Sequence, residues 1–296
     1  MMKNNNIRHI DKIYQATSQH WVGDAFLVQP LFSHMGEDRG TDPFLMLDYA
    51  APRHFEASSS HIRGVGQHPH KGFETVTVAY QGEVAHKDST GAGGIIAEGD
   101  VQWMTAGSGI IHEEYHSEAF SQAGGVLEMV QLWVNLPAKD KNAPAAYQHL
   151  SKDAIPVVNL ENNTGYLRLI AGEYQGTQGA ARTFTEMNVW DVVINANEQI
   201  SLTVPATHNL SMVVLRGEAT FNQQGSAGAG QLVVFQKTAG DVQIQAGDEA
   251  LKILLLSGVP IDEPIVGYGP FVMNSREEII DAINDFNSGR FGQIAH

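Results

Sequence analysis

A short stretch near residue 80, Val78–Val84 (VAYQGEV), returns later in the chain as Val214–Ala219 (VLRGEA). Each copy is followed about twenty residues later by Thr-Ala-Gly, at Thr105–Gly107 and at Thr238–Gly240. In both copies an apolar run ends at a glycine, which is typical of a strand that enters a turn. The repeat therefore predicts two β units in tandem, each with its own core.

Short apolar runs fill most of the remaining chain. They are rich in Val, Ile, Leu and aromatic residues, and the 30 glycines of the chain supply many of the breaks between them. Closely spaced short strands favour a sandwich or barrel over alternating strands and helices, so an all-β fold is expected. The clearest predicted strands are Phe73–Ala79, Gly125–Leu136, Val189–Ala196, Leu210–Leu215, Gln231–Phe235 and Leu251–Leu256.

The predicted boundary between the two units lies in Pro137–Pro156, a stretch with Pro, Ala, Lys and Asp that is typical of a linker. We therefore expect one unit over residues 1–140 and a second over residues 141–296. One large sandwich is the alternative, and the internal repeat argues against it.

A helix is predicted at the C-terminal end, over about residues 275–288. Ser275 followed three residues later by Glu278 forms a capping box, and Gly289 is a suitable stop. Between these signals, apolar residues recur at helical spacing. They are Ile279, Ile280, Ile283 and Phe286.

Composition narrows the classes of function. The chain has 296 residues and no cysteine, so disulfides, thiolate metal sites and cysteine nucleophiles are excluded. Its net charge of −15 disfavours direct nucleic-acid binding, which requires neutralisation of phosphates. No apolar run is long enough for a membrane helix, and the polar N-terminus leads into no signal-peptide core, so a cytoplasmic location is expected.

The histidines are unevenly distributed. Eleven of the 13 lie at or before His149, and only His208 and His296 follow it. Any histidine-based site is therefore expected in the first unit.

Two motifs in that unit have the spacing of metal ligands. On a strand, residues i and i+2 point to the same face, so His68 and His70 can direct two imidazoles to one point. His112 and Glu114 can do the same from another strand, while Glu113 faces away. Three histidines and one carboxylate with open positions suit a divalent first-row metal, iron above all.

Spacing alone leaves the carboxylate ligand undecided. Glu74 has the same strand parity as His68 and His70, so it competes with Glu114. His86 and His116 are expected at the surface or in support of the ligands.

Six short motifs occur in an order and at spacings that extend over nearly the whole chain. They are Asp42–Leu45, His68–Val76, Gly99–Gly107, Gly109–His112, Gln131–Leu136 and Gly269–Asn274. Together they resemble the pirin family, a branch of the cupin superfamily with two barrels in one chain. The resemblance implies two tandem cupin (jelly-roll) β-barrels with a C-terminal helix.

The resemblance also implies the ligand set. In pirins the carboxylate is the Glu two residues after the third histidine, so the implied metal ligands are His68, His70, His112 and Glu114. Glu74 then becomes a neighbour. Fe(II) is the usual metal of the family, and cupin sites also accept other divalent transition metals. The chain departs from the family at Glu113, where a small residue is common, and we expect little effect on ligation.

The second unit is expected to lack metal ligands. Spacing of the repeat places Thr203 and Pro205 opposite the first histidine pair, and Gln245 and Gly247 opposite the second motif. None of these is a good iron ligand, and His208 is alone.

Some pirins resemble quercetin 2,3-dioxygenases, oxidoreductases that open the central ring of a flavonol with O₂. This implies a small phenolic substrate and a general base beside the metal, for which Glu114 is the best candidate. The alternative is an iron-containing, non-catalytic regulator that binds a transcription factor or a metabolic enzyme. The acidic charge permits a basic protein partner but argues against direct DNA contact.

Overall fold

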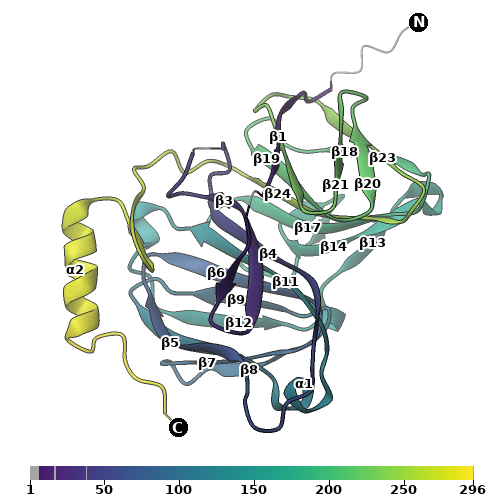
Figure 1. The fold of residues 1–296 in the computed structure, drawn as a ribbon. Coiled ribbons are helices and arrows are strands. Elements are labelled where there is room, and N and C mark those ends of the chain that lie inside the picture. Colours follow the sequence, from purple (N-terminus) through teal and green to yellow (C-terminus); the bar gives the residue numbers. More distant parts are fainter. Residues whose placement is uncertain (1–6, 17, 38, 296) are drawn as a thin grey trace, which may run out of the picture. The chain divides into compact units, whose positions relative to one another are not determined.

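The computed structural model describes residues 7–16, 18–37 and 39–295, and most of its regular structure is β-strand (Figure 1). The chain forms two compact units. The N-terminal barrel unit comprises Ser18–Glu37, Phe44–Lys152 and Ile261–His296, and the C-terminal barrel unit comprises Met1–Thr17, Asp38–Pro43 and Asp153–Pro260, in each case as far as these residues are described.

The N-terminal barrel unit is built on two antiparallel sheets. The larger has the order β12 (Ala146–Leu150), β9 (Val101–Thr105), β6 (Phe73–Gln81), β11 (Gly125–Asn135), β4 (Phe44–Phe55), β3 (Phe26–Ser33) and β2 (His20–Val22). The smaller has the order β5 (Gly64–His70), β10 (Ile110–His116), β7 (Val84–Asp88) and β8 (Gly93–Ile96).

The C-terminal barrel unit repeats this pattern. Its larger sheet has the order β1 (Ile10–Gln15), β22 (Gln231–Phe235), β19 (Asn209–Arg216), β24 (Leu251–Gly258), β17 (Met187–Ile194), β14 (Gly165–Ala171) and β13 (Val157–Asn159). Its smaller sheet has the order β18 (Gln199–Thr203), β23 (Asp241–Ala246), β20 (Glu218–Phe221) and β21 (Gly225–Gly228). A short hairpin, β15 (Glu173–Tyr174) and β16 (Thr177–Gln178), completes this unit.

The matching strand orders confirm the internal repeat and the all-β fold. The repeated glycines mark the same turn in each unit, since Gly82 joins β6 to β7 and Gly217 joins β19 to β20. Both have positive φ, +79° and +76°, a conformation that glycine adopts without strain. The six strands named from sequence are present, each with bounds within two residues of the prediction.

The division into units differs from a single boundary after residue 140. Strand β1 pairs with β22 and so belongs to the C-terminal barrel unit, although it begins the described chain. Strand β12, inside the predicted linker, pairs with β9 of the N-terminal barrel unit. The C-terminal segment also belongs to the N-terminal barrel unit. The unit to which an edge strand belongs is decided by its pairing with a strand distant in the sequence. Local composition does not indicate that pairing.

Helix α2 (Arg276–Asn287) confirms the predicted C-terminal helix. The Ser275 side chain caps it by accepting from the Glu278 backbone N–H at 3.2 Å. Its buried residues are Ile279 and Ala282, whereas Ile280 is 57% exposed, so the predicted stripe is wider than the face that packs. The remaining short elements are β25 (Val266–Tyr268), β26 (Phe271–Met273) and the unexpected helix α1 (Glu118–Ala123), together with 3-10 turns at Ala138–Asp140, Lys152–Ala154 and Glu161–Asn163.

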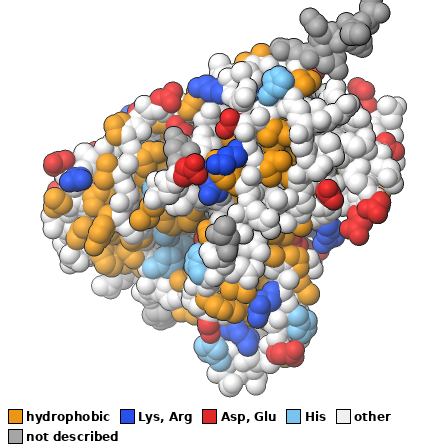
Figure 2. All heavy atoms as spheres, turned by 45° about the horizontal axis from the view of Figure 1, so that its top comes forward, with side chains coloured by type: hydrophobic (Ala, Val, Ile, Leu, Met, Phe, Trp, Pro, Cys, Tyr) orange, Lys and Arg blue, Asp and Glu red, His pale blue; other side chains and the backbone are white. Residues whose placement is uncertain are grey.

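Acidic and basic side chains are interspersed on the face shown in Figure 2. None of the described helices combines the length and apolar character needed to span a bilayer.

Candidate metal centre

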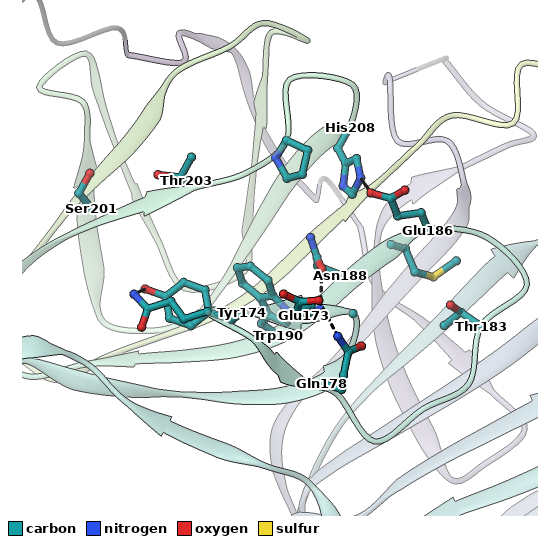
Figure 3. Close-up of a pocket in the computed structure, with 14 residues that line it drawn as sticks. Glu173, Tyr174, Gln178, Thr183, Glu186, Asn188, Trp190, Ser201, Thr203 and His208 are labelled. Carbon is teal, nitrogen blue, oxygen red and sulfur yellow. Dashed lines mark hydrogen bonds and ion pairs between the residues drawn. The ribbon is translucent and has the colours of Figure 1, made fainter.

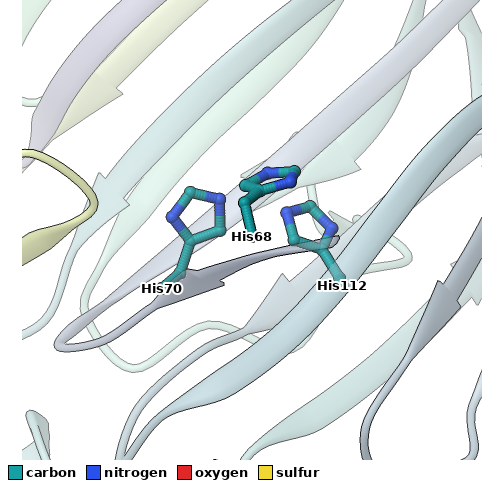
Figure 4. Close-up of side chains that lie close together, drawn as sticks. All are labelled: His68, His70 and His112. Atoms are coloured by element: carbon teal, nitrogen blue, oxygen red, sulfur yellow. The ribbon is translucent and has the colours of Figure 1, made fainter. Parts of the chain in front are cut away.

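Three of the predicted ligands meet between two paired strands of the smaller N-terminal sheet (Figure 4). His68 and His70 lie on β5, and His112 lies on β10 directly opposite His68. The ring centroids of His68 and His112 are 4.2 Å apart, and those of His70 and His112 are 4.8 Å apart. One nitrogen from each ring lies within 4.8 Å of the other two, which is the spacing of ligands around one ion.

The hydrogen bonds of these rings leave nitrogen lone pairs free for a metal. His68 Nδ1 lies 2.9 Å from the Gly66 carbonyl oxygen, so Nδ1 carries a proton, and in the neutral ring Nε2 is the nitrogen with a free lone pair. Nδ1 of His70 and Nε2 of His112 are buried and have no hydrogen-bond partner. Buried polar atoms without partners are costly in a folded protein, and a bound cation would satisfy both. The residues present therefore fit a metal ion.

The protonation of these rings also suits metal binding. Burial, together with the neighbouring His68, lowers the pKa of His70 well below its usual value. Burial and the adjacent histidines do the same to the pKa of His112. Both imidazoles are therefore neutral near pH 7, the form that binds metals.

A fourth histidine, His86, and Asp88 fix the orientation of His112. His86 Nε2 lies 3.1 Å from Asp88 Oδ2, and both side chains are fully buried. Because a carboxylate only accepts, His86 Nε2 carries a proton, and in the neutral ring Nδ1 is then an acceptor. His112 Nδ1, 3.4 Å away, then donates to it, and Nε2 of His112 is left unprotonated. Sequence reasoning expected His86 at the surface or in support of the ligands and missed Asp88, although their i, i+2 spacing places both on one face of β7.

Glu114 lies at the edge of this cluster. It pairs with His86 across β10 and β7, and its carboxylate falls within 4.8 Å of donor atoms of His86 and His112. The Thr77 hydroxyl lies 3.4 Å from Glu114 Oε1 and 3.0 Å from Gln131 Oε1, and its single proton can be donated to only one of them. The four predicted side chains thus fall into two overlapping groups that share His112, and His86 joins the second.

Glu74 falls in neither group of described residues. It lies on β6 of the larger sheet, where it accepts from the Thr105 hydroxyl at 2.7 Å. The turn at Gly72 separates β5 from β6, so shared parity in sequence does not mean a shared face. Burial raises the pKa of Glu74 to about 7.

Glu113 also stands apart, as predicted from strand alternation. It pairs with Lys87 on the adjacent strand β7, while its neighbours His112 and Glu114 supply the two groups. The departure at this position therefore leaves the cluster unchanged.

Aromatic side chains border the site beside His70. The rings of Phe73 and Trp133 lie 5.2 and 5.4 Å from the His70 ring and 4.3 Å from each other. Phe73 is fully buried in a small core cluster, and Trp133 packs against that cluster while remaining partly exposed.

Two family models match the chain, one for pirin over residues 26–134 and one for the pirin C-terminal cupin domain over residues 189–292. The chain belongs to the pirin family. Among its relatives, a Pseudomonas aeruginosa protein with a provisional quercetin 2,3-dioxygenase name is 52% identical over 94% of this chain and 96% of its own. A pirin-like protein of Arabidopsis thaliana is 38% identical over 86% of this chain and 82% of its own.

Solved structures agree with this assignment. A crystal structure described as quercetin 2,3-dioxygenase from Acinetobacter baumannii superposes with a TM-score of 0.93. It is 48% identical to this pirin and covers 98% of this chain and 100% of its own. The tandem cupin fold is thereby established.

The strand register shows what replaces the ligands in the second cupin domain of this pirin. His68 pairs with His112 on β5 and β10, and the corresponding pair on β18 and β23 is Leu202 with Val242. His86 lies four residues after Gly82, and Phe221 lies four residues after Gly217. Phe221 pairs with Ile244, as His86 pairs with Glu114.

The counterparts of the four predicted ligands are therefore apolar. They are Leu202, Val204, Val242 and Ile244, and all belong to the core of the C-terminal barrel unit. The positions expected from repeat spacing, Thr203, Pro205, Gln245 and Gly247, are wrong by one or more residues. A one-residue shift moves a strand residue to the opposite face, so sequence spacing could not fix this alignment.

Proposed function

We propose that this pirin is a metal-dependent dioxygenase that opens the central ring of a flavonol such as quercetin at a mononuclear Fe(II). The observation that carries the proposal is the cluster of His68, His70 and His112, in which His70 and His112 are buried and each keep one ring nitrogen without a hydrogen-bond partner. The dioxygenase names of the Pseudomonas relative and of the Acinetobacter structure support the same reaction class.

His68, His70 and His112 would hold the metal, with Glu114 as the fourth ligand. A redox-active divalent metal with open positions would supply Lewis acidity toward the flavonol and electron transfer with O₂. Three neutral imidazoles and one carboxylate would leave the ion with limited positive charge. We prefer Fe(II) because three histidines and one carboxylate with open positions suit a divalent first-row metal, iron above all.

Glu114 would also act as the base toward the 3-hydroxyl of the flavonol. A general base must lie within hydrogen-bond reach of the proton it removes, and Glu114 is the carboxylate grouped with the ligand His112.

Trp133 would orient the substrate. It is partly exposed and lies beside His70, and flat aromatic rings pack favourably on such a surface, whereas Phe73 is fully buried and packs against the Trp133 ring. Burial of the site also limits access of water to the deprotonated flavonol.

Turnover by the metal-loaded protein tests the proposal. The full chain is prepared anaerobically, loaded with Fe(II) and mixed with quercetin and O₂, and carbon monoxide release and loss of the flavonol absorbance are followed. Turnover is expected in the unmodified chain and in His54→Ala, a surface control that is 60% exposed. It should fall at least a hundredfold in His70→Ala and in Glu114→Gln.

The regulator alternative gives a different result. The regulator would be favoured over the enzyme if the fully loaded protein shows no turnover and binds a protein partner only when its iron is in one oxidation state.

The Glu114→Gln variant can separate the base role of Glu114 from its role as a ligand. If this variant still binds metal but loses turnover, Glu114 acts as the base.

A further inference from the structure

The smaller sheet of the N-terminal barrel unit carries a second site on the face opposite the metal centre. A cavity of about 500 Å³, here called the outer cavity, is lined there by Glu113 and Tyr115 of β10 and by Ala85 and Lys87 of β7. These two strands pair without a bulge, and the four residues alternate along them with those of the metal centre. The outer cavity therefore lies on the other side of the sheet from His112, and its volume is within the range of small-molecule sites.

Glu113 is a buried carboxylate without a partner. The residue is only 7% exposed, and its side chain makes no hydrogen bond or ion pair with any residue that the structure describes. Lys87 is its neighbour in the strand register, but the two side chains are not within ion-pair distance. Neither carboxylate oxygen is fully enclosed by protein atoms, so the part of Glu113 that remains accessible includes its carboxylate. Because Glu113 lines the outer cavity, that carboxylate is open to a ligand there.

Apolar side chains surround this carboxylate. Ile62 and Ile95 line the outer cavity and are 40% and 45% exposed. The Tyr115 ring packs directly on the backbone of Gly64, its partner on β5, since a Cβ added at Gly64 would lie 2.0 Å from Tyr115 Cδ1. This part of the wall is therefore fixed before any ligand arrives.

The charge of the lining favours a cation. Three carboxylates line the outer cavity, those of Glu83, Glu113 and Glu118, with one Lys and no Arg. Glu83 Oε2 already accepts from the Ser117 hydroxyl at 2.6 Å. A buried carboxylate is stabilised by a cation that donates hydrogen bonds to it, whereas an anion would be repelled.

The larger cavity of the C-terminal barrel unit, which borders β18, has no comparable group (Figure 3). Its two lining carboxylates are both paired. Glu173 accepts from Gln178 at 2.5 Å, and Glu186 lies 3.1 Å from His208. These pairs use the charged groups that a ligand would otherwise contact.

We propose that the outer cavity binds a small organic cation, a primary ammonium joined to an apolar chain or ring. The ammonium would donate to Glu113, and the apolar part would pack on Ile62, Ile95 and Tyr115. The proposal depends neither on the metal centre nor on dioxygenase activity.

Binding of matched probes tests the proposal. The full chain is titrated with 2-phenylethylammonium and with n-hexylammonium, and binding is followed by calorimetry and saturation-transfer NMR. Phenylethanol and phenylacetate serve as the uncharged and anionic comparators. We expect saturable binding of at least one ammonium probe, and at least tenfold weaker binding of both comparators. Affinity should be the same with and without a metal chelator, because the probe does not bind at the metal centre.

Two cavity variants locate the site. Glu113→Gln keeps the size of the side chain but removes its charge, and should weaken binding of the ammonium about tenfold or more. Ile95→Ala, at the exposed edge strand β8, removes part of the apolar wall and should weaken binding about two- to fivefold. Glu98→Gln makes the same charge change at an exposed position outside the lining and should leave binding unchanged.

Three results would overturn the proposal. They are the absence of saturable binding by either ammonium probe, binding of phenylacetate as tight as that of 2-phenylethylammonium, and unchanged affinity in folded Glu113→Gln. If Glu113→Gln does not fold, unchanged affinity in Ile95→Ala would overturn it instead.

Discussion

At the scale of single residues, the metal centre depends on which nitrogen of each histidine carries a proton. The hydrogen-bonded series Asp88, His86, His112 assigns those protons without any metal present. Ligand histidines are commonly fixed in this way by a carboxylate, and loss of that support typically weakens metal binding.

Asp88→Asn should therefore weaken metal binding by about 10- to 100-fold. The amide can donate to His86 Nε2, which reverses the tautomers of His86 and His112 and places a proton on the ligand nitrogen. Competition with a chromophoric chelator measures the dissociation constant. Asp100→Asn, which alters the Asp100–His149 pair at 3.1 Å, is the matched control. Equal metal affinity in the two variants would contradict the tautomer assignment.

The raised pKa of Glu74 should make the free energy of unfolding depend on pH. Burial raises its pKa to about 7, above the usual 4.5, so the folded state favours the protonated acid. The resulting stability is complete below about pH 4.5 and is lost as the pH rises through 7. Glu74→Gln should remove this loss and raise the free energy of unfolding at pH 8 by up to about 3 kcal/mol.

Urea unfolding of the metal-free chain between pH 5 and 8 measures this difference. The exposed variant Glu98→Gln should keep the slope of the unmodified protein. If the free energy of unfolding of Glu74→Gln changes with pH as it does in the unmodified protein, Glu74 is ionised in the folded protein and the raised pKa is wrong.

Residue types and spacing indicated that His68, His70 and His112 can come together, and the resemblance to pirins implied that they do. They could not select the supporting pair His86 and Asp88, because their role depends on β7 lying next to β10. They also could not separate Glu74 from Glu114, because strand parity is lost across the turn at Gly72.

At the scale of elements, the repeated glycine turns define each barrel. In the turn between β6 and β7, an added Cβ at Gly82 would lie 2.9 Å from the Val126 carbonyl oxygen. Gly91, in the turn after β7, has a similar φ of +84° but no atom within 4 Å of such a Cβ.

Gly82→Ala should therefore destabilise the protein more than Gly91→Ala. Both substitutions should cost about 1 kcal/mol for a left-handed backbone conformation, and only Gly82→Ala adds a contact with backbone. Thermal or urea unfolding of the two variants measures the difference. Equal losses would show that the chain around Val126 moves without resistance.

Strand positions and the C-terminal helix followed from local patterns, because turns and the capping box are local signals. The assignment of β1 and β12 to their barrel units could not be predicted from local patterns, because an edge strand is placed by a partner strand more than forty residues away. The correspondence of β18 with β5 likewise required the register, since repeat spacing misplaced it by a residue.

At the scale of the whole molecule, the same cupin framework is used twice with different interiors. The N-terminal barrel unit brings imidazoles and a carboxylate together where the C-terminal one has Leu202, Val204, Val242 and Ile244. One unit can therefore be stabilised by a metal, while the other rests on apolar packing.

Metal removal should accordingly loosen one unit only. Hydrogen exchange of backbone amides in β5 and β10 should become about tenfold faster or more after chelation, because bound metal stabilises the folded state. The equivalent strands β18 and β23 provide an internal control and should be unaffected. Faster exchange in both pairs would mean that the metal stabilises the chain globally.

The most direct measurement of the central claim is the metal content of the purified full chain and its single-histidine variants. The account predicts one metal ion per chain in the unmodified protein and in His54→Ala, and almost none in correctly folded His70→Ala. Metal that remains at full occupancy in His70→Ala, or that is absent from unmodified protein after loading with Fe(II), would contradict it.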